Sequence, residues 1–192
     1  MVGMAKDFAH LHVHTEYSML DGAAKIKKLV KEAKAQGQKS VAITDHGYCF
    51  GAYEFYKACK DADIKPIIGV EAYMTPGTSR YSSNRVLWGD DTQRSDDVSA
   101  RGAYTHLTLL SYNNTGLHNL FRMASRASLE GQMGKWPRLD MDLLETYHDG
   151  LIATAGCPSG EVQTRLRLGQ FDEAYAAAGR MQDLFGKENY FV

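Results

Sequence analysis

The residues best suited to chemistry lie near the start of the chain, where His10, His12 and His14 alternate with two aliphatic residues. Successive side chains of an extended strand point to opposite faces, so this spacing predicts that the three imidazoles share one face. Neutral imidazole is a common metal ligand, and a strand would hold such ligands in a fixed relation. We therefore expect the segment to open a metal site. The simpler alternative is a half-exposed strand whose polar residues face water.

Other residues able to bind a metal follow at intervals along the chain. They are Asp21, His46, Glu71, His106 and Cys157. Together with His12 and His14 they provide four imidazoles, two carboxylates and a thiol, which suits zinc, manganese or iron and exceeds what one tetrahedral ion needs. Two or three adjacent divalent ions are therefore expected. Such sites bind the attacking and leaving oxygens in phosphoester cleavage and lower the pKa of a bound water.

Each of these later residues also has a simpler interpretation. His46 could be a turn former, His106 a core histidine, and Cys157 a small buried hydrophobic residue. Glu71 lies between apolar neighbours, where a carboxylate without a partner is costly, so a ligand role is favoured. Asp45 could orient a neighbouring ligand.

Helical and strand patterns alternate along the chain and must position these residues. Apolar spacing predicts helices near residues 23–36, 52–59, 117–124, 140–147 and 171–185, and strands at 10–15, 40–44, 66–73, 104–111, 150–157 and 189–192. This α/β alternation predicts parallel β/α units in a sheet that is either open and doubly wound or closed as a barrel. In both cases the carboxyl ends of the strands meet at one edge, where we expect most of the candidate ligands.

Local patterns complete this organisation. Asp21 is placed to cap the first helix, and Gly37 fits the position after its end. Residues 75–103 are polar and rich in turn formers, so they predict a long surface loop inserted into one domain over residues 1–192, with one short ordered piece around residues 86–88. Residues 131–137 predict a second loop. Long loops inside a compact domain are often functional.

The composition narrows the classes of partner and location. A net charge of -1, from 22 Lys+Arg and 23 Asp+Glu, leaves no overall basic footprint for nucleic acid, although a local groove could be basic. No apolar run approaches the length of a membrane span, and the start of the chain lacks a signal-peptide core, so we expect a cytoplasmic protein with no membrane partner. The three cysteines are widely spaced and odd in number, which argues against a disulfide framework.

Several motifs occur in an order that is specific to one family. They are HLHVHTEYSMLDG from His10, TDHG from Thr44, GVEAY from Gly69 and GCPSGEV from Gly156. The chain thereby resembles the PHP (polymerase and histidinol phosphatase) domain over essentially its whole length. KPIIGVEAY and the segment EVQTRL at residues 161–166 resemble, more narrowly, the PHP domain at the amino terminus of bacterial DNA polymerase III alpha subunits.

The resemblance implies a fold and a ligand set. The fold would be a distorted, TIM-barrel-like β/α barrel of seven strands around a trinuclear metal centre. Matched motif by motif, the ligands would be His12, His14, Asp21, His46, Glu71, His106 and Cys157, with the first four also acting in catalysis, and His10 would not be a ligand. The family's last two ligands, an Asp and a His, come from a later motif, so we expect a PHP domain that is incomplete at its carboxyl terminus.

The resemblance also implies an activity. PHP domains that keep their ligands resemble metal-dependent 3′–5′ exonucleases that proofread DNA, working beside the remaining polymerase domains and replisome subunits. Every ligand position present in this chain is intact, which favours that class. Arg165 or Arg167 would be candidates to hold the DNA backbone. The two alternatives are a metal-binding domain that only stabilises the polymerase and a stand-alone phosphatase of the histidinol-phosphatase type.

Overall fold

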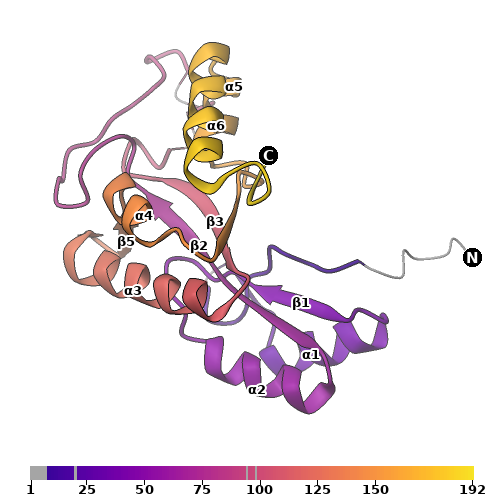
Figure 1. Cartoon of the computed structure of the whole chain (residues 1–192). Helices are drawn as coiled ribbons and strands as arrows, with labels where there is room; N and C mark the ends of the chain where they lie inside the picture. The colour runs from indigo at the N-terminus through magenta and orange to yellow at the C-terminus, as the bar shows by residue number, and fades with distance from the viewer. Residues whose placement is uncertain (1–7, 20, 94, 98) are drawn as a thin grey trace, which may run out of the picture.

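A computed structural model of the chain describes residues 8–19, 21–93, 95–97 and 99–192 (Figure 1). Its helices are α1 Ile26–Ala35, α2 Ala52–Ala62, α3 Asn114–Glu130, α4 Met141–Tyr147, α5 Glu161–Arg167 and α6 Phe171–Phe185. Its strands are β1 Ser40–Ile43, β2 Lys65–Met74, β3 Thr105–Ser111, β4 Gln132–Met133, β5 Trp136–Leu139, β6 Leu151–Thr154 and β7 Tyr190–Phe191. The expectation for the start of the chain, residues 1–7, falls outside the described ranges.

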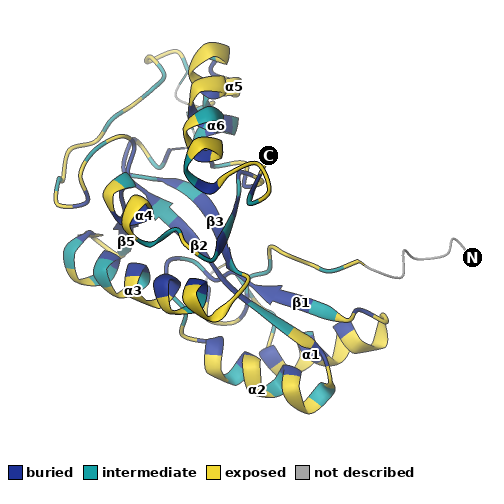
Figure 2. Ribbon diagram, in the orientation of Figure 1, coloured by how far each residue is buried: buried dark blue, intermediate teal, exposed yellow. Residues whose placement is uncertain are grey.

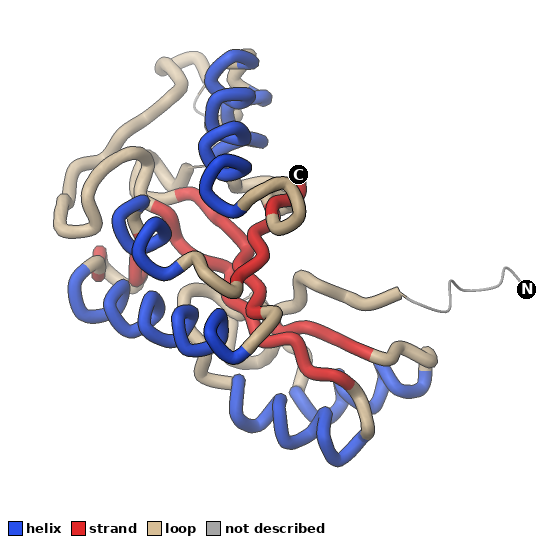
Figure 3. The backbone as a smooth tube through the Cα atoms, in the orientation of Figure 1, coloured by secondary structure: helices blue, strands red, loops and turns tan. Residues whose placement is uncertain are grey.

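The described strands form one sheet in the order β4-β5-β2-β3-β6-β7, and β1 also pairs with β2. Strand β2 is its centre: its first four residues pair in parallel with β1, its last two pair in parallel with β5, and β3 runs along its other side. Figure 3 shows the strands crossing the middle of the molecule with helices around them. Among the described residues the outer strands β4 and β7 do not pair, so the observed sheet is open and closure as a barrel stays a prediction.

The expected all-parallel sheet is wrong. Strand β3 is antiparallel to both β2 and β6, and β4 is antiparallel to β5, whereas β1, β5 and β7 each join the sheet in parallel. Parallel neighbours need a crossover connection, usually a helix. The described part of residues 75–104 contains no helix or strand, and the chain returns to the edge it left, so that Met74 pairs with Thr105.

Two local predictions also need correction. Residues 10–15 form no regular strand, although they run beside β1: the N–H of Ala42 donates to the carbonyl of His10 at 2.9 Å. The ladder is broken because the N–H of Val13 donates to the side-chain Oγ1 of Thr44 at 2.9 Å. The expected loop at 131–137 is instead the β4–β5 hairpin, whose turn passes through Gly134 at φ 61°.

The helix ends confirm one prediction and contradict another. Helix α1 begins at Ile26 after Lys25, with no side-chain cap, so Asp21 does not cap it. Gly37 has φ 75°, and its N–H donates to the carbonyl of Lys34 at 3.0 Å, as expected for a residue just past a helix end. Helix α5 was not expected from the apolar spacing, because seven residues are too few to show a clear period.

The core lies between the sheet and the inner faces of the helices, whose outer faces are exposed (Figure 2). Among the described residues two buried side chains are arginines, Arg80 and Arg138, and Arg138, in β5, is the more deeply buried at 1% exposed. Its guanidinium donates to the carbonyls of Gly131, Ala103 and Arg80 at 3.3 Å and of Ser82 at 2.6 Å. These bonds fasten the long loop to the sheet. Within the described ranges no helix is both long and apolar enough to cross a membrane.

Candidate metal centre

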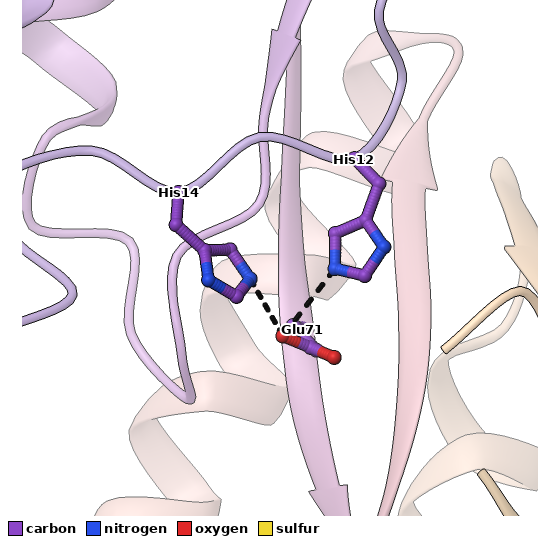
Figure 4. Close-up of side chains that lie close together, drawn as sticks. All are labelled: His12, His14 and Glu71. Carbon is purple, nitrogen blue, oxygen red and sulfur yellow. Dashed lines mark ion pairs between the residues drawn. The ribbon is translucent and has the colours of Figure 1, made fainter. Parts of the chain in front are cut away.

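Glu71, near the end of β2, is the centre of a cluster of imidazoles and is 1% exposed. One of its oxygens, Oε2, lies 3.3 Å from His12 Nε2, 2.6 Å from His14 Nε2 and 3.1 Å from His46 Nδ1. The other, Oε1, lies 2.8 Å from His106 Nδ1. Figure 4 shows the rings of His12 and His14 reaching Glu71 from the segment that passes over β2. Four imidazoles from three separate parts of the chain therefore surround one buried carboxylate.

The remaining expected ligands lie in the same place. Asp21 Oδ2 is 2.8 Å from His14 Nδ1 and 2.6 Å from His46 Nε2, so its carboxylate contacts two imidazoles instead of the helix end. Cys157 is buried on the same cleft, and burial together with a hydrogen bond to Glu71 raises the pKa of its thiol to about 12. The structure thus brings together all seven residues singled out from the sequence.

His10 does not belong to this group. Its ring is exposed and contacts the edge of the Phe8 ring, with 4.8 Å between centroids. Alternation predicted that the three histidines of the segment would share one face. The prediction is wrong for His10 because the segment is not a regular strand.

The direction of β3 decides where His106 lies. His106 is the second residue of β3 and pairs with Tyr73, two residues after Glu71. In a parallel strand it would lie at the opposite edge of the sheet from the end of β2. The antiparallel pairing therefore brings His106 to the ligand cluster.

Asp45 holds two ligand-bearing segments together. Its buried carboxylate accepts hydrogen bonds from the N–H of Thr15 at 2.6 Å, from Thr15 Oγ1 at 2.7 Å and from Ser18 Oγ at 2.6 Å. The N–H of His46 in turn donates to Ser18 Oγ at 3.2 Å. Asp45 contacts no imidazole through its side chain in these bonds. It acts on the backbone that carries His14 and His46, and so supports neighbouring ligand candidates through the chain.

A close backbone approach at Gly22 completes the turn that carries Asp21. A Cβ atom at Gly22 would lie 2.1 Å from the carbonyl oxygen of Thr15, which is too near for any side chain. The N–H of Gly22 donates to the carbonyl of Ser18 at 2.7 Å. Glycine at this position is therefore required for the observed placement of Asp21.

The proximity of these groups shifts their proton affinities. Burial alone would raise the pKa of Glu71, but the imidazoles of His106, His12 and His14 outweigh it and hold the pKa well below its usual value. Burial opposes protonation of His14, yet contacts with Glu71 and Asp21 raise its pKa. Burial lowers the pKa of His46 despite its contact with Asp21. The cluster therefore carries ionised carboxylates beside imidazoles of differing basicity.

Several of the short contacts are not hydrogen bonds. Among the described side chains, His14 Nε2, His46 Nδ1, His106 Nδ1 and Glu71 Oε2 are buried without a hydrogen-bond partner of suitable geometry. Buried polar atoms usually have such a partner, and unsatisfied ones are costly. Imidazole nitrogens and a carboxylate oxygen aimed at a common space form a ligand set for a divalent ion. The donor set therefore fits a metal.

A family model, the PHP domain, matches residues 10–192. The chain belongs to the PHP domain family. The "DNA polymerase III subunit alpha" of Mycobacterium tuberculosis is 57% identical over 185 residues, and that of Aquifex aeolicus is 43% identical over 187 residues. The aligned parts cover 96% and 97% of this chain but only 16% and 15% of those proteins.

Among solved structures, a protein from Bifidobacterium adolescentis described as a candidate metal-dependent phosphoesterase aligns with a TM-score of 0.45 and 16% identity. The alignment covers 88% of this PHP domain and 74% of that chain.

The cleft of this PHP domain has a second wall, which the sequence interpretation missed. It has a volume of about 540 Å³ and is lined by the seven expected residues together with Met19, Tyr73, Tyr104, Lys135, Trp136, Pro158 and Ser159. Alternate residues of a strand share a face. Tyr73, two residues after Glu71, could therefore have been predicted, whereas Trp136 could not, because the β4–β5 hairpin was not expected.

Proposed function

We propose that this PHP domain is part of a DNA polymerase III alpha subunit and acts as a metal-dependent phosphoesterase on the 3′ end of DNA, as a proofreading 3′–5′ exonuclease. The observation that carries the proposal is Glu71, a buried carboxylate surrounded by His12, His14, His46 and His106. The 43–57% identity to polymerase subunits supports the polymerase context. The proposal includes a closed barrel, a cytoplasmic location, and contact with the other polymerase domains and replisome subunits.

The donor atoms suggest how many ions the centre holds. Three groups of residues converge closely enough to bind one ion each: His12, His14 and Glu71; His14, Asp21 and His46; and His46, Glu71 and His106. A neutral imidazole offers only one acceptor nitrogen. The first and third groups share no imidazole and have only Glu71 in common, so these residues could hold two ions at once.

Asp21 has a role in either arrangement. With the first and third groups filled, its carboxylate accepts from the remaining ring N–H groups of His14 and His46, which fixes their tautomers. With the second group filled, Asp21 is itself a ligand, as the sequence predicted. Zinc, manganese and iron all suit this mixture of nitrogen and oxygen donors.

The chemistry is divided between the ions and the chain. Divalent ions supply Lewis-acid stabilisation of the phosphate and an activated water. The chain's own residues would fix the geometry: Glu71 and the imidazoles would hold the ions, and Asp45 keeps the segments of His14 and His46 together. At the rim, exposed Lys135 places a positive charge where a phosphate of the substrate would pass.

The test compares two histidines of one segment. We expect His14→Ala to slow manganese- or zinc-dependent release of nucleoside monophosphate from a mismatched 3′ end by about a hundredfold or more, as loss of a metal ligand should. His10→Ala is the matched control and should leave the rate unchanged, because its ring lies outside the cluster. Unchanged mismatch removal by the His14→Ala protein would contradict the exonuclease proposal.

A purely structural role is the second candidate, and one observation favours it. The cluster joins residues 12–21, the end of β1, β2 and β3, so ions bound there would cross-link four segments. A ligand that binds only the folded state raises its stability. Loss of thermal stability on chelation, without hydrolysis of DNA before chelation, would establish this candidate. Turnover of a small phosphate monoester with no effect on DNA would instead indicate a stand-alone phosphatase.

A further inference from the structure

One wall of the cleft is aromatic. The rings of Tyr73 and His46 are stacked, with 5.8 Å between centroids. Tyr104 lies 5.3 Å from His106 and 5.1 Å from Trp136, so its ring stands between the ligand cluster and the indole. All three aromatic residues are half-buried, and each lines the cleft. The series of rings therefore continues from the ligands to the rim.

The outer end of this wall combines a flat ring with a charge. Trp136 begins β5, and Lys135 precedes it in the exposed turn of the β4–β5 hairpin. Pro137 and Arg138, which follow Trp136, are buried, and Arg138 is fastened by its four carbonyl contacts. The hairpin is therefore held at its base while the indole and the ammonium group remain accessible at its tip.

We propose that Trp136 and Lys135 form a nucleotide subsite, in which the 3′-terminal base of a single-stranded nucleic acid end stacks on Trp136. The proposal rests on the proposed function, since it assigns the substrate of the same cleft. An aromatic face binds any base, because every base has a π-face, and a nearby lysine binds phosphate without regard to sequence. This suits a site that must accept all four nucleotides.

The alternative occupants of the cleft fit this wall less well. A small phosphate monoester needs only the ligand cluster and an enclosed pocket, whereas this cleft is open and its aromatic wall extends beyond the ligands. A paired duplex end keeps its terminal base stacked on its neighbour. A frayed or mismatched end presents a free base at little energetic cost. The wall therefore selects unpaired ends.

The test measures recognition of the base without hydrolysis. In the presence of a chelator, fluorescence anisotropy would compare a labelled oligothymidylate with the same oligonucleotide carrying an abasic 3′-terminal nucleotide. We expect the wild-type protein to bind the intact end about tenfold more tightly, the size of one base–aromatic stacking contact. Equal affinity of the wild-type protein for the two oligonucleotides would overturn the proposal. This result would not bear on the separate test of metal-dependent hydrolysis.

Variants then locate the contact. Trp136→Ala should abolish the preference for the intact end, and Trp136→Phe should restore most of it, since a smaller aromatic ring still stacks. Phe171→Ala removes an aromatic residue of α6 that is 68% exposed and does not line the cleft, so it should leave the preference unchanged. A preference that survives in Trp136→Ala would also overturn the proposal, even if the protein hydrolyses DNA normally.

Discussion

Glu71 and Arg138 are both ionisable, and both are 1% exposed, but their surroundings differ. The guanidinium of Arg138 donates to four carbonyl oxygens, three from the long loop and one from Gly131. Glu71 faces four imidazoles at 2.6–3.3 Å, and its Oε2 has no hydrogen-bond partner of suitable geometry among the described residues. Hydrogen bonds within the protein satisfy the buried charge of Arg138. The atoms around Glu71 still lack partners, which a bound ion would provide.

This contrast separates a structural polar group from a functional one. A satisfied network such as that of Arg138 orders the chain around it, because any movement leaves hydrogen bonds unmade. The Glu71 cluster leaves donor atoms of several segments unsatisfied, which is costly unless another molecule or ion completes it. Substitution at Arg138 should therefore lower stability without changing metal affinity, whereas substitution at Glu71 should mainly reduce the stability gained from metal.

The largest expected effect is at Arg138. Arg138→Met should lower the free energy of unfolding by about 4 kcal/mol, because it leaves buried carbonyl oxygens of the loop without donors. Urea denaturation measures this loss, with the exposed arginine substitution Arg122→Met as the control. Protein that remains folded should bind zinc with unchanged affinity. A cost below about 1 kcal/mol would show that the buried guanidinium does not hold the loop.

The next effect is linked to metal. At a zinc concentration about one hundred times the dissociation constant, binding should stabilise the wild-type protein by about 2.7 kcal/mol, and Glu71→Gln should lose most of this gain. The substitution keeps the shape of the side chain but removes the charge that bound ions would share. Thermal unfolding with zinc and with chelator measures the difference. The proposed centre would be wrong if zinc raised the melting temperature of both proteins equally.

A smaller loss of stability is expected at Asp140, a buried carboxylate whose hydrogen bonds are made within the protein. Its carboxylate caps α4 through the N–H of Leu143 and accepts from the N–H and Nη1 of Arg80. Asp140→Asn keeps a capping side chain and weakens the ion pair, so we expect a loss of about 1.5 kcal/mol, with about 1 kcal/mol more for Asp140→Ala. Chemical denaturation of the two variants separates the two contributions. Equal losses would mean that the cap contributes nothing.

The smallest effect is the pH dependence of the metal-free protein. Burial opposes but does not overcome the contacts with Glu71 and Asp21, so the pKa of His14 in the folded state is raised above its usual value. The stability it contributes is therefore fully present below the unfolded pKa of about 6.5 and is lost as pH rises through the folded pKa. In chelator, the stability difference between wild type and His14→Ala should shrink from pH 6 to pH 8.

Metal should reverse this trend, because imidazole ligands bind ions in their neutral form. The affinity of the wild-type protein for zinc should rise over the same pH interval, as titration at each pH would show. An affinity that falls with rising pH would contradict ligation by His14.

Much of the organisation could be predicted from the sequence because it depends on local periodicity. Apolar spacing predicted helices near residues 52–59 and 171–185 and a strand at 66–73, which the structure contains as α2, α6 and β2. Gly37 follows from the need for a positive φ after α1. The ordered motifs identified the family and named seven residues that the structure brings together. Their role as metal ligands stays a prediction, and so does closure of the barrel.

The direction of β3 and the placement of Asp21 could not be predicted, because they depend on contacts between segments far apart in the sequence. Alternation of helices and strands cannot reveal that β3 runs antiparallel, because the direction is set by where the 75–104 segment returns, and that return is fixed by contacts such as those of Arg138. Asp21 fits a helix cap by sequence position, but the approach permitted by Gly22 turns it toward His14 and His46.

The sequence by itself determined most of the helices and strands, the family and the chemical types of the candidate ligands, because each of these depends on residues close together along the chain. Only the tertiary structure decided which nitrogens face Glu71, and that Trp136 lies beside Tyr104 on the aromatic wall of the cleft. Those outcomes depend on strand direction, register and buried hydrogen bonds between distant segments, and such contacts leave no periodic pattern in the sequence.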